Sequence, residues 1–197
     1  MKIITKSLII GIVLTFLFSM IPFTSQCENI SSELFRLHIL ANSDSESDQE
    51  LKLKVRDKIL DYTKNLYKAS ATKSETIKIT KDNLDNILSV ANEEVKRLGY
   101  SYKVNGKITR MFFNTRTYGD YTIPSGTYDA LRITIGKGEG HNWWCVMYPS
   151  FCLGESTDLQ NSTLTDNDKE LISDNSGYKI KFQIVEWIEK LKSYFKY

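Results

Sequence analysis

The chain contains two histidines, His38 and His141, and a histidine is the usual general base of a hydrolase. Neither histidine lies in a G-x-S-x-G or H-E-x-x-H motif. Cys145 could act as a nucleophile with His141 as its base, but about 13 Å would separate their backbones on an extended chain. The sequence therefore predicts no assembled catalytic site and favours a protein that is not an enzyme.

Two of the three cysteines, Cys145 and Cys152, are separated by six residues. In an exported protein such a pair is typical of a disulfide, and closing so short a loop stabilises a fold by roughly 2.5 kcal/mol. Two thiols alone make a poor zinc site, because structural zinc usually takes four ligands. A redox pair is more often spaced C-x-x-C. We therefore expect a disulfide between Cys145 and Cys152.

Two other segments have the composition of ligand-binding loops. Gly136–Gly140 is rich in glycine, like a phosphate-binding loop, but a strand-like segment follows it where a helix would be needed. The acidic residues from Asp44 to Glu50 alternate as calcium ligands sometimes do. That segment lacks the glycine at the sharp turn and the bidentate glutamate of a calcium loop. We therefore expect no metal, no cofactor and no small-molecule substrate.

The remaining candidates for a binding surface are basic and aromatic. Arg36 and His38 share one face of a predicted strand, and Arg132 is out of phase with its apolar neighbours in another. If these strands are adjacent, the three side chains form a polar patch, and an ordinary solvated face is the alternative. Trp143 and Trp144 would point to opposite faces of a strand. One of them could therefore anchor a protein interface or stack on a sugar, and packing under a helix is the alternative.

The N-terminus has the three-part layout of a secretory signal peptide. Two lysines precede Leu8–Phe18, which is an uninterrupted run of apolar and small neutral residues, and small polar residues follow. The stretch from Leu8 to Phe23 covers 16 residues, fewer than the roughly 20 that cross a bilayer as a helix. We expect residues 1–26 to be a cleaved signal peptide, with a retained transmembrane anchor as the alternative.

Residues 27–197 have the length and composition of one globular domain. The whole chain is 41% hydrophobic and 25% charged, which are ordinary globular values. The net charge of +2 comes from Lys2 and Lys6, because 24 of the 26 basic residues remain without them, against 24 acidic residues. A neutral mature domain argues against nucleic acid or an anionic membrane surface as the main partner.

The periodicity of apolar residues predicts helices first and strands later. One helix is expected to begin with a capping box of Ser47 and Glu50, and the next to run from an N-cap at Thr80 to a stop at Gly99. Strands are expected at 35–40, 100–113, 127–135 and 142–148, and further helices at 166–173 and 183–195. This grouping predicts an α+β fold with an antiparallel or mixed sheet of about four strands and packed helices.

Two long segments resemble the stage II sporulation protein R family. Arg36–Leu60 reads RLHILANSDSESDQELKLKVRDKIL and shows the family's R-L-H, A-N-S-D, D-Q and L-K-x-x-V-R-D succession. Thr115–Cys152 shows the patterns P-x-G-x-Y-x-A-L-R and I-G-x-G-x-G-x-N-W-W-C-V, followed by P and C. A weaker match, YKIKFQIVEWIEKLK, lies near the C-terminus. Ser150 is a small departure, because the family often has a second proline there.

The resemblance implies a signalling function. Members are made in the forespore of endospore-forming bacteria and exported into the space between the two septal membranes. There they activate a membrane-embedded aspartic peptidase of the mother cell, which removes the pro-sequence of the mother-cell sigma factor (sigma-E). The family motifs mark these residues as candidates for partner binding: Arg36, His38, Asn42, Asp44, Arg132, Trp143 and Trp144.

Other interpretations stay open beside this one. Asn42 and Asp44 could simply order the loop that enters the first helix. A secreted cell-wall hydrolase would need His38 or His141 as a catalytic group, and a wall-binding module would rest on the exposed aromatic residues. Under the signalling interpretation, the chain contacts a membrane only through its receptor or an uncleaved signal segment.

Overall fold

The structure is a computed structural model that describes residues 2–68, 70–149, 162–173 and 178–194. Contacts within the chain divide it into two compact units. The sheet unit comprises residues 33–111 and 127–164, and the α1 unit comprises residues 1–32, 112–126 and 165–197. In chain order the elements are α1 (Lys2–Glu33), β1 (Phe35–Leu40), α2 (Glu46–Tyr67), α3 (Lys73–Asp82), α4 (Leu84–Arg97), β2 (Val104–Phe113), β3 (Arg116–Tyr118), β4 (Tyr121–Ile123), β5 (Gly126–Ile135), β6 (Asn142–Tyr148), α5 (Asp166–Ile172) and α6 (Lys179–Tyr194).

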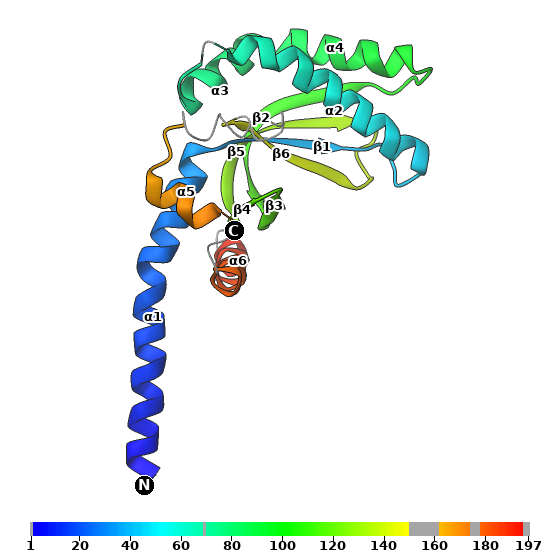
Figure 1. The fold of residues 1–197 in the computed structure, drawn as a ribbon. Coiled ribbons are helices and arrows are strands. Elements are labelled where there is room, and N and C mark those ends of the chain that lie inside the picture. The colour runs from blue at the N-terminus through cyan, green and yellow to red at the C-terminus, as the bar shows by residue number, and fades with distance from the viewer. Residues whose placement is uncertain (1, 69, 150–161, 174–177, 195–197) are drawn as a thin grey trace. The chain divides into compact units, whose positions relative to one another are not determined.

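The sheet unit is built on a four-stranded mixed sheet with the strand order β2-β5-β1-β6 (Figure 1). β1 runs parallel to β5 and antiparallel to β6. Parallel strands need a long connection between them, and here the chain from β1 to β5 contains α2, α3 and α4. The predicted α+β fold, with a mixed sheet of about four strands and packed helices, is confirmed.

Helices α2, α3 and α4 cover one face of this sheet (Figure 1). The odd-numbered residues of β1 and β5 point toward these helices, and the even-numbered ones toward the opposite face, because side chains alternate along a strand. The core between sheet and helices contains fully buried apolar side chains, among them Phe35, Leu37, Ile39, Leu131, Ile133, Val55, Ile59, Ile87, Ala91 and Val95. Arg36, His38 and Arg132 are therefore placed on the face away from the helices.

α2 begins earlier than the predicted capping box. Its N-cap is Ser45, whose hydroxyl accepts a hydrogen bond from the backbone N–H of Asp48 at 3.3 Å. Ser47, the predicted cap, lies inside the helix. Serine stands at both positions, so the choice depends on the loop before the helix, which the local sequence does not specify.

The second predicted helix corresponds to α4, and the helix α3 before it was not predicted. α3 is capped by Thr72, and α4 starts after Asn83, so Thr80 is an interior residue of α3. The Thr80 hydroxyl is buried and donates to the carbonyl oxygen of Thr76 at 2.7 Å. It also lies 2.6 Å from the hydroxyl of Tyr67. A threonine buried in this way needs no capping role, which is why the prediction of an N-cap there was wrong.

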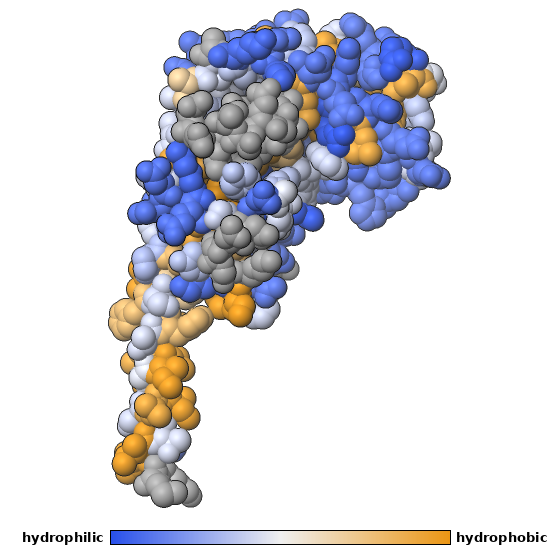
Figure 2. All heavy atoms as spheres, viewed as in Figure 1, coloured by the Kyte–Doolittle hydropathy of each residue, from blue (hydrophilic) through white to orange (hydrophobic). Residues whose placement is uncertain are grey.

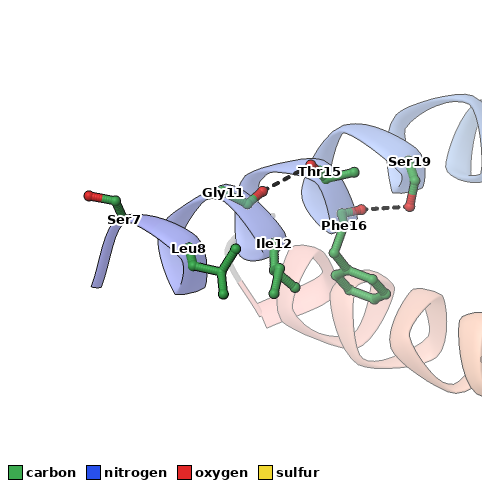
Figure 3. Close-up of a pocket in the computed structure, with 7 residues that line it drawn as sticks. All are labelled: Ser7, Leu8, Gly11, Ile12, Thr15, Phe16 and Ser19. Carbon is green, nitrogen blue, oxygen red and sulfur yellow. Dashed lines mark hydrogen bonds between the residues drawn. The ribbon is translucent and has the colours of Figure 1, made fainter. Parts of the chain in front are cut away.

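The α1 unit joins the N-terminal helix to the two-stranded β3–β4 sheet, α5 and α6. α1 is long and apolar enough from Ile3 to Glu33 to cross a membrane. Its C-terminal part packs into the unit, because Met20, Phe23, Cys27 and Ile30 are buried at spacings of three and four residues. Its N-terminal part carries the hollow of Figure 3, which is lined by Ser7, Leu8, Gly11, Ile12, Thr15, Phe16 and Ser19.

Candidate functional site

Three of the predicted binding residues form a row across adjacent strands. In the register of the sheet, His38 of β1 lies opposite Arg132 of β5 on one side and opposite Trp144 of β6 on the other. All three have the parity that points away from helices α2–α4. The sequence predicts Arg132 on the Arg36 and His38 face only if the two strands are adjacent, and β1 and β5 are adjacent. We call Arg132, His38 and Trp144 the cross-strand row.

Arg36 lies two residues before His38 on β1, on the same face of the sheet, and is fully buried. Its guanidinium carbon lies 4.9 Å from the ring centroid of Tyr128 on β5. A guanidinium over an aromatic face is attracted by the electrons of the ring, and the attraction is larger where water is excluded. Tyr128 was not among the predicted site residues. It has the same parity on β5 as Arg132, and this periodicity is the signal that could have identified it.

His38 is buried between the other members of the row. Its ring meets the Trp144 ring edge to face, with 6.0 Å between centroids. Burial, and then the positive charges of Arg132 and Arg36, lower the pKa of His38 to about 4. The imidazole is therefore neutral at physiological pH and does not add a third positive charge to the face.

The side chains of this face differ in how far they are exposed. Arg36 and His38 are buried, whereas Arg132 and Trp144 are each partly exposed. The Arg132 Nε atom is buried and has no hydrogen-bond partner among the described residues. Arg132 and Trp144 are thus the partly exposed side chains of the row, and the buried His38 lies between them.

Trp143 lies on the helix-covered face, opposite to Trp144, as the alternation of the strand predicted. It packs against the core, and the guanidinium carbon of Arg56 on α2 lies 4.2 Å from its ring centroid. The structure separates the two tryptophans by role: Trp143 helps to join sheet and helices, and Trp144 belongs to the cross-strand row.

Asn42 is enclosed by the glycine-rich loop after β5. Its side-chain oxygen accepts from the backbone N–H of Lys137 at 3.0 Å, and its amide nitrogen donates to Asp48 at 2.9 Å. A Cβ on Gly136 would lie 2.3 Å from that same Asn42 oxygen, and one on Gly140 would lie 2.1 Å from the carbonyl oxygen of Ser43. The glycines are needed so that the two loops can approach, which gives Gly136–Gly140 a structural explanation without a phosphate.

Asp44 is paired with His141 at the rim of the same loops. Its carboxylate accepts from the backbone N–H of His141 and contacts the Nδ1 atom of its ring. The backbone hydrogen bond and then the ring hold the pKa of Asp44 below its usual value. Both side chains are largely exposed, at 54% for Asp44 and 80% for His141. The structure therefore places Asn42 and Asp44 in a loop cluster that is separate from the cross-strand row.

Comparison with known proteins identifies the family. The model of stage II sporulation protein R matches residues 31–158. The stage II sporulation protein R of Bacillus subtilis (strain 168) is 31% identical over 187 residues, which cover 83% of this chain and 84% of that protein. This chain belongs to the stage II sporulation protein R family. No solved structure matches it.

Membership in the stage II sporulation protein R family supports a role in sporulation, and the apolar α1 is consistent with export. The matched segment contains the cross-strand row, Arg36, Tyr128 and the loop cluster. Among the described residues, no group of three or more His, Cys, Asp or Glu side chains could hold a metal ion. Cys145 is buried, but Cys152 lies outside the described residues, so their disulfide stays a prediction.

Proposed function

We propose that this protein is an exported signal that binds and activates a membrane-embedded aspartic peptidase of the mother cell. The activated peptidase would remove the pro-sequence of the mother-cell sigma factor. The proposal places the sheet unit in the space between the forespore and mother-cell membranes. Its main support is membership in the stage II sporulation protein R family.

The cross-strand row is the surface that we assign to the peptidase. Trp144 offers a large, partly exposed apolar ring, and Arg132, on the other side of His38, offers a partly exposed guanidinium. Tryptophan and arginine are the residues that most often dominate binding energy at protein interfaces. Because His38 stays neutral and Arg36 is fully buried, the face presents the charge of Arg132, and a partner segment with a carboxylate and an apolar side chain would complement it.

Co-expression in a host that does not sporulate tests this proposal. The chain, the peptidase and the sigma-factor precursor are produced together, and precursor cleavage is followed by immunoblot. The chain is produced either complete or with arginine in place of Leu8 and Leu14, which interrupts the apolar run and leaves the buried residues from Met20 onward in place. We expect cleavage with the unaltered chain alone, because the altered form stays in the cytoplasm. Cleavage that is independent of the chain, or equal with both forms, would contradict the proposal.

A cell-wall hydrolase is the second candidate, because His141 and Asp44 form a pair of the kind that orients a catalytic base. His38 is a poor base, since burial and the two arginines keep its pKa at about 4. The variants His141→Gln and His38→Gln separate the candidates. The signalling proposal predicts that His141→Gln retains precursor cleavage, whereas a hydrolase that uses this dyad would lose its activity on purified peptidoglycan.

A further inference from the structure

α6 has two apolar faces, and only one of them is used inside the α1 unit. Phe182 and Val185 are buried, each with 2% of its surface exposed. On the other side, Ile180, Trp187 and Leu191 are 72%, 68% and 58% exposed. Their spacings of seven and four residues align them on one stripe of the helix. The half-buried Ile184 and Ile188 widen this stripe. We call these five residues the outer face of α6.

Contacts with α1 fix which side of α6 is turned inward. The rings of Phe23 and Phe182 lie 5.4 Å apart between centroids, and Lys192 lies 3.3 Å from a carboxylate oxygen of Glu28. The Lys181 ammonium lies 5.4 Å from the Phe23 ring centroid. α6 is therefore anchored on the segment of α1 between residues 23 and 28. The outer face points away from this contact, because it is exposed.

The same helix α1 has the properties of a membrane span next to that contact. Large apolar side chains from Ile3 to Phe18 are exposed, and they form the orange column of Figure 2. The hydroxyls of Thr15 and Ser19 donate to carbonyl oxygens of their own helix at 2.9 and 2.7 Å (Figure 3), and the hydroxyl of Thr24 does the same at 2.9 Å. A membrane span must satisfy its polar groups internally in this way, since lipid tails offer no partners.

The burial of α1 residues argues that this span stays attached to the protein. A cut after residue 26 would remove Met20 and Phe23 from the core of the α1 unit and would leave Phe182 without its aromatic partner. The exposed part before Met20 is about 17 residues long, which is the lower end of the range that crosses a bilayer. The bilayer would then begin where the exposed part of α1 meets the buried core of the α1 unit, near Met20 and close to the residues that hold α6.

We propose that the outer face of α6 lies on the surface of the bilayer that α1 crosses. The composition fits this place, because tryptophan prefers the boundary between lipid and water and lysines beside an apolar stripe can reach the headgroups. Lys190 lies beside the stripe, whereas Lys181 on its other side is held at the Phe23 ring. This contact is additional to membrane attachment through the receptor or the N-terminal segment, and it does not depend on the peptidase.

Quenching by brominated lipid tests the contact directly. The complete chain is reconstituted into phosphatidylcholine vesicles with bromine on the acyl chains near the headgroup, and tryptophan emission is compared with vesicles without bromine. A helix seated at the boundary buries its apolar side by about 5–10 Å, so we expect the bromine to remove about half of the Trp187 emission. The variant Trp187→Phe should lose this quenchable part, and Trp144→Phe should keep it.

Equal quenching in the wild type and in Trp187→Phe would overturn the proposal. Absence of quenching in the wild type would overturn it too, and is expected if a second copy of the chain covers the outer face. Both variants replace one aromatic ring by another at exposed or partly exposed positions, and circular dichroism checks that they fold. No peptidase is present, so the result is independent of the function proposed above.

Discussion

Trp144 is the aromatic side chain of the cross-strand row that remains partly exposed. We predict that Trp144→Ala lowers precursor cleavage by about tenfold or more, because losing an aromatic anchor typically costs 2 kcal/mol or more of binding energy. The midpoint of urea unfolding should change little. Unaltered cleavage, or global unfolding of the variant, would remove Trp144 from the interface.

Trp143 supplies the matched control on the neighbouring residue. It packs against the helix-covered core and under Arg56, so Trp143→Ala should destabilise the sheet unit by about 2 kcal/mol. The two substitutions remove the same side chain from opposite faces of β6. We expect Trp144→Ala to lower precursor cleavage with little change in stability, and Trp143→Ala to lower stability with little change in cleavage. Equal effects of the two substitutions would contradict the division of roles.

His38 makes the stability of the sheet unit depend on pH. Its folded-state pKa of about 4 lies below the unfolded value of 6.5, so the unfolded chain binds the proton more readily. The contribution of the neutral His38 to the free energy of unfolding is therefore fully present above about pH 6.5 and is lost as the pH falls toward 4. At pH 5 the loss is about 2 kcal/mol relative to pH 7.

Urea unfolding at pH 7 and pH 5 measures this effect. His38→Gln should unfold with a smaller difference between the two pH values than the wild type, because glutamine does not titrate. His141→Gln is the control: its imidazole is 80% exposed, so the wild-type difference should persist. If His38→Gln and the wild type show the same difference, the histidine is not held neutral by its surroundings.

At the scale of elements, the approach of the loop after β1 to the loop after β5 depends on glycine. A Cβ at residue 140 would lie 2.1 Å from the Ser43 carbonyl oxygen, which is backbone and cannot turn aside. We predict that Gly140→Ala destabilises the sheet unit by about 2 kcal/mol or more. Thermal unfolding followed by circular dichroism measures it.

Gly119→Ala is the control for that substitution. Gly119 has a φ of 55°, but no atom lies within 4 Å of the position that its Cβ would take. Only the backbone strain of about 1 kcal/mol should therefore appear. A larger loss at residue 119 than at residue 140 would show that close packing of the loops is not what requires the glycine.

The C-terminal part of α1 is expected to stabilise its own unit. Phe23 is 5% exposed and packs on α6, so Phe23→Ala should cost about 3 kcal/mol. Amide hydrogen exchange of the complete chain in detergent should then speed up in α6 and stay unchanged in the sheet. Phe18 lies on the same helix and is 69% exposed, so Phe18→Ala should leave amide exchange in α6 and in the sheet unchanged. Faster exchange in α6 of the Phe18→Ala variant would contradict this packing.

The sequence predicted the elements better than their ends. β6 has the predicted bounds, and the period-two pattern placed Arg36, His38 and Arg132 on one face, because alternation follows from strand geometry alone. The N-caps of α2 and α4 are Ser45 and Asn83. Their positions depend on how neighbouring segments pack, so the local pattern misplaced these two caps at Ser47 and Thr80. Strand order is a tertiary property, so Arg132 could be expected beside His38 only on the condition that their strands are adjacent, and the sequence did not place Trp144 in the cross-strand row.

At the scale of the whole molecule, the two proposals concern different units of the chain. The match to stage II sporulation protein R covers residues 31–158 and therefore the cross-strand row. α6 lies beyond the matched segment, and most of α1 lies before it. The proposed partner surface belongs to the sheet unit, and the proposed bilayer contact belongs to the α1 unit. Cleavage near residue 26 stays a sequence-based prediction, and the packing of Phe23 argues against it.

The most direct test of the account is a photo-crosslink from the cross-strand row to the peptidase. A benzophenone amino acid replaces Trp144 in the complete chain, which is co-expressed with the peptidase and irradiated. The account predicts a crosslinked product that contains both proteins, and a much weaker one from the same probe at Lys78 on the helix-covered side. A crosslink of equal yield from both positions, or from Lys78 alone, would contradict the assignment of the partner to this face of the sheet.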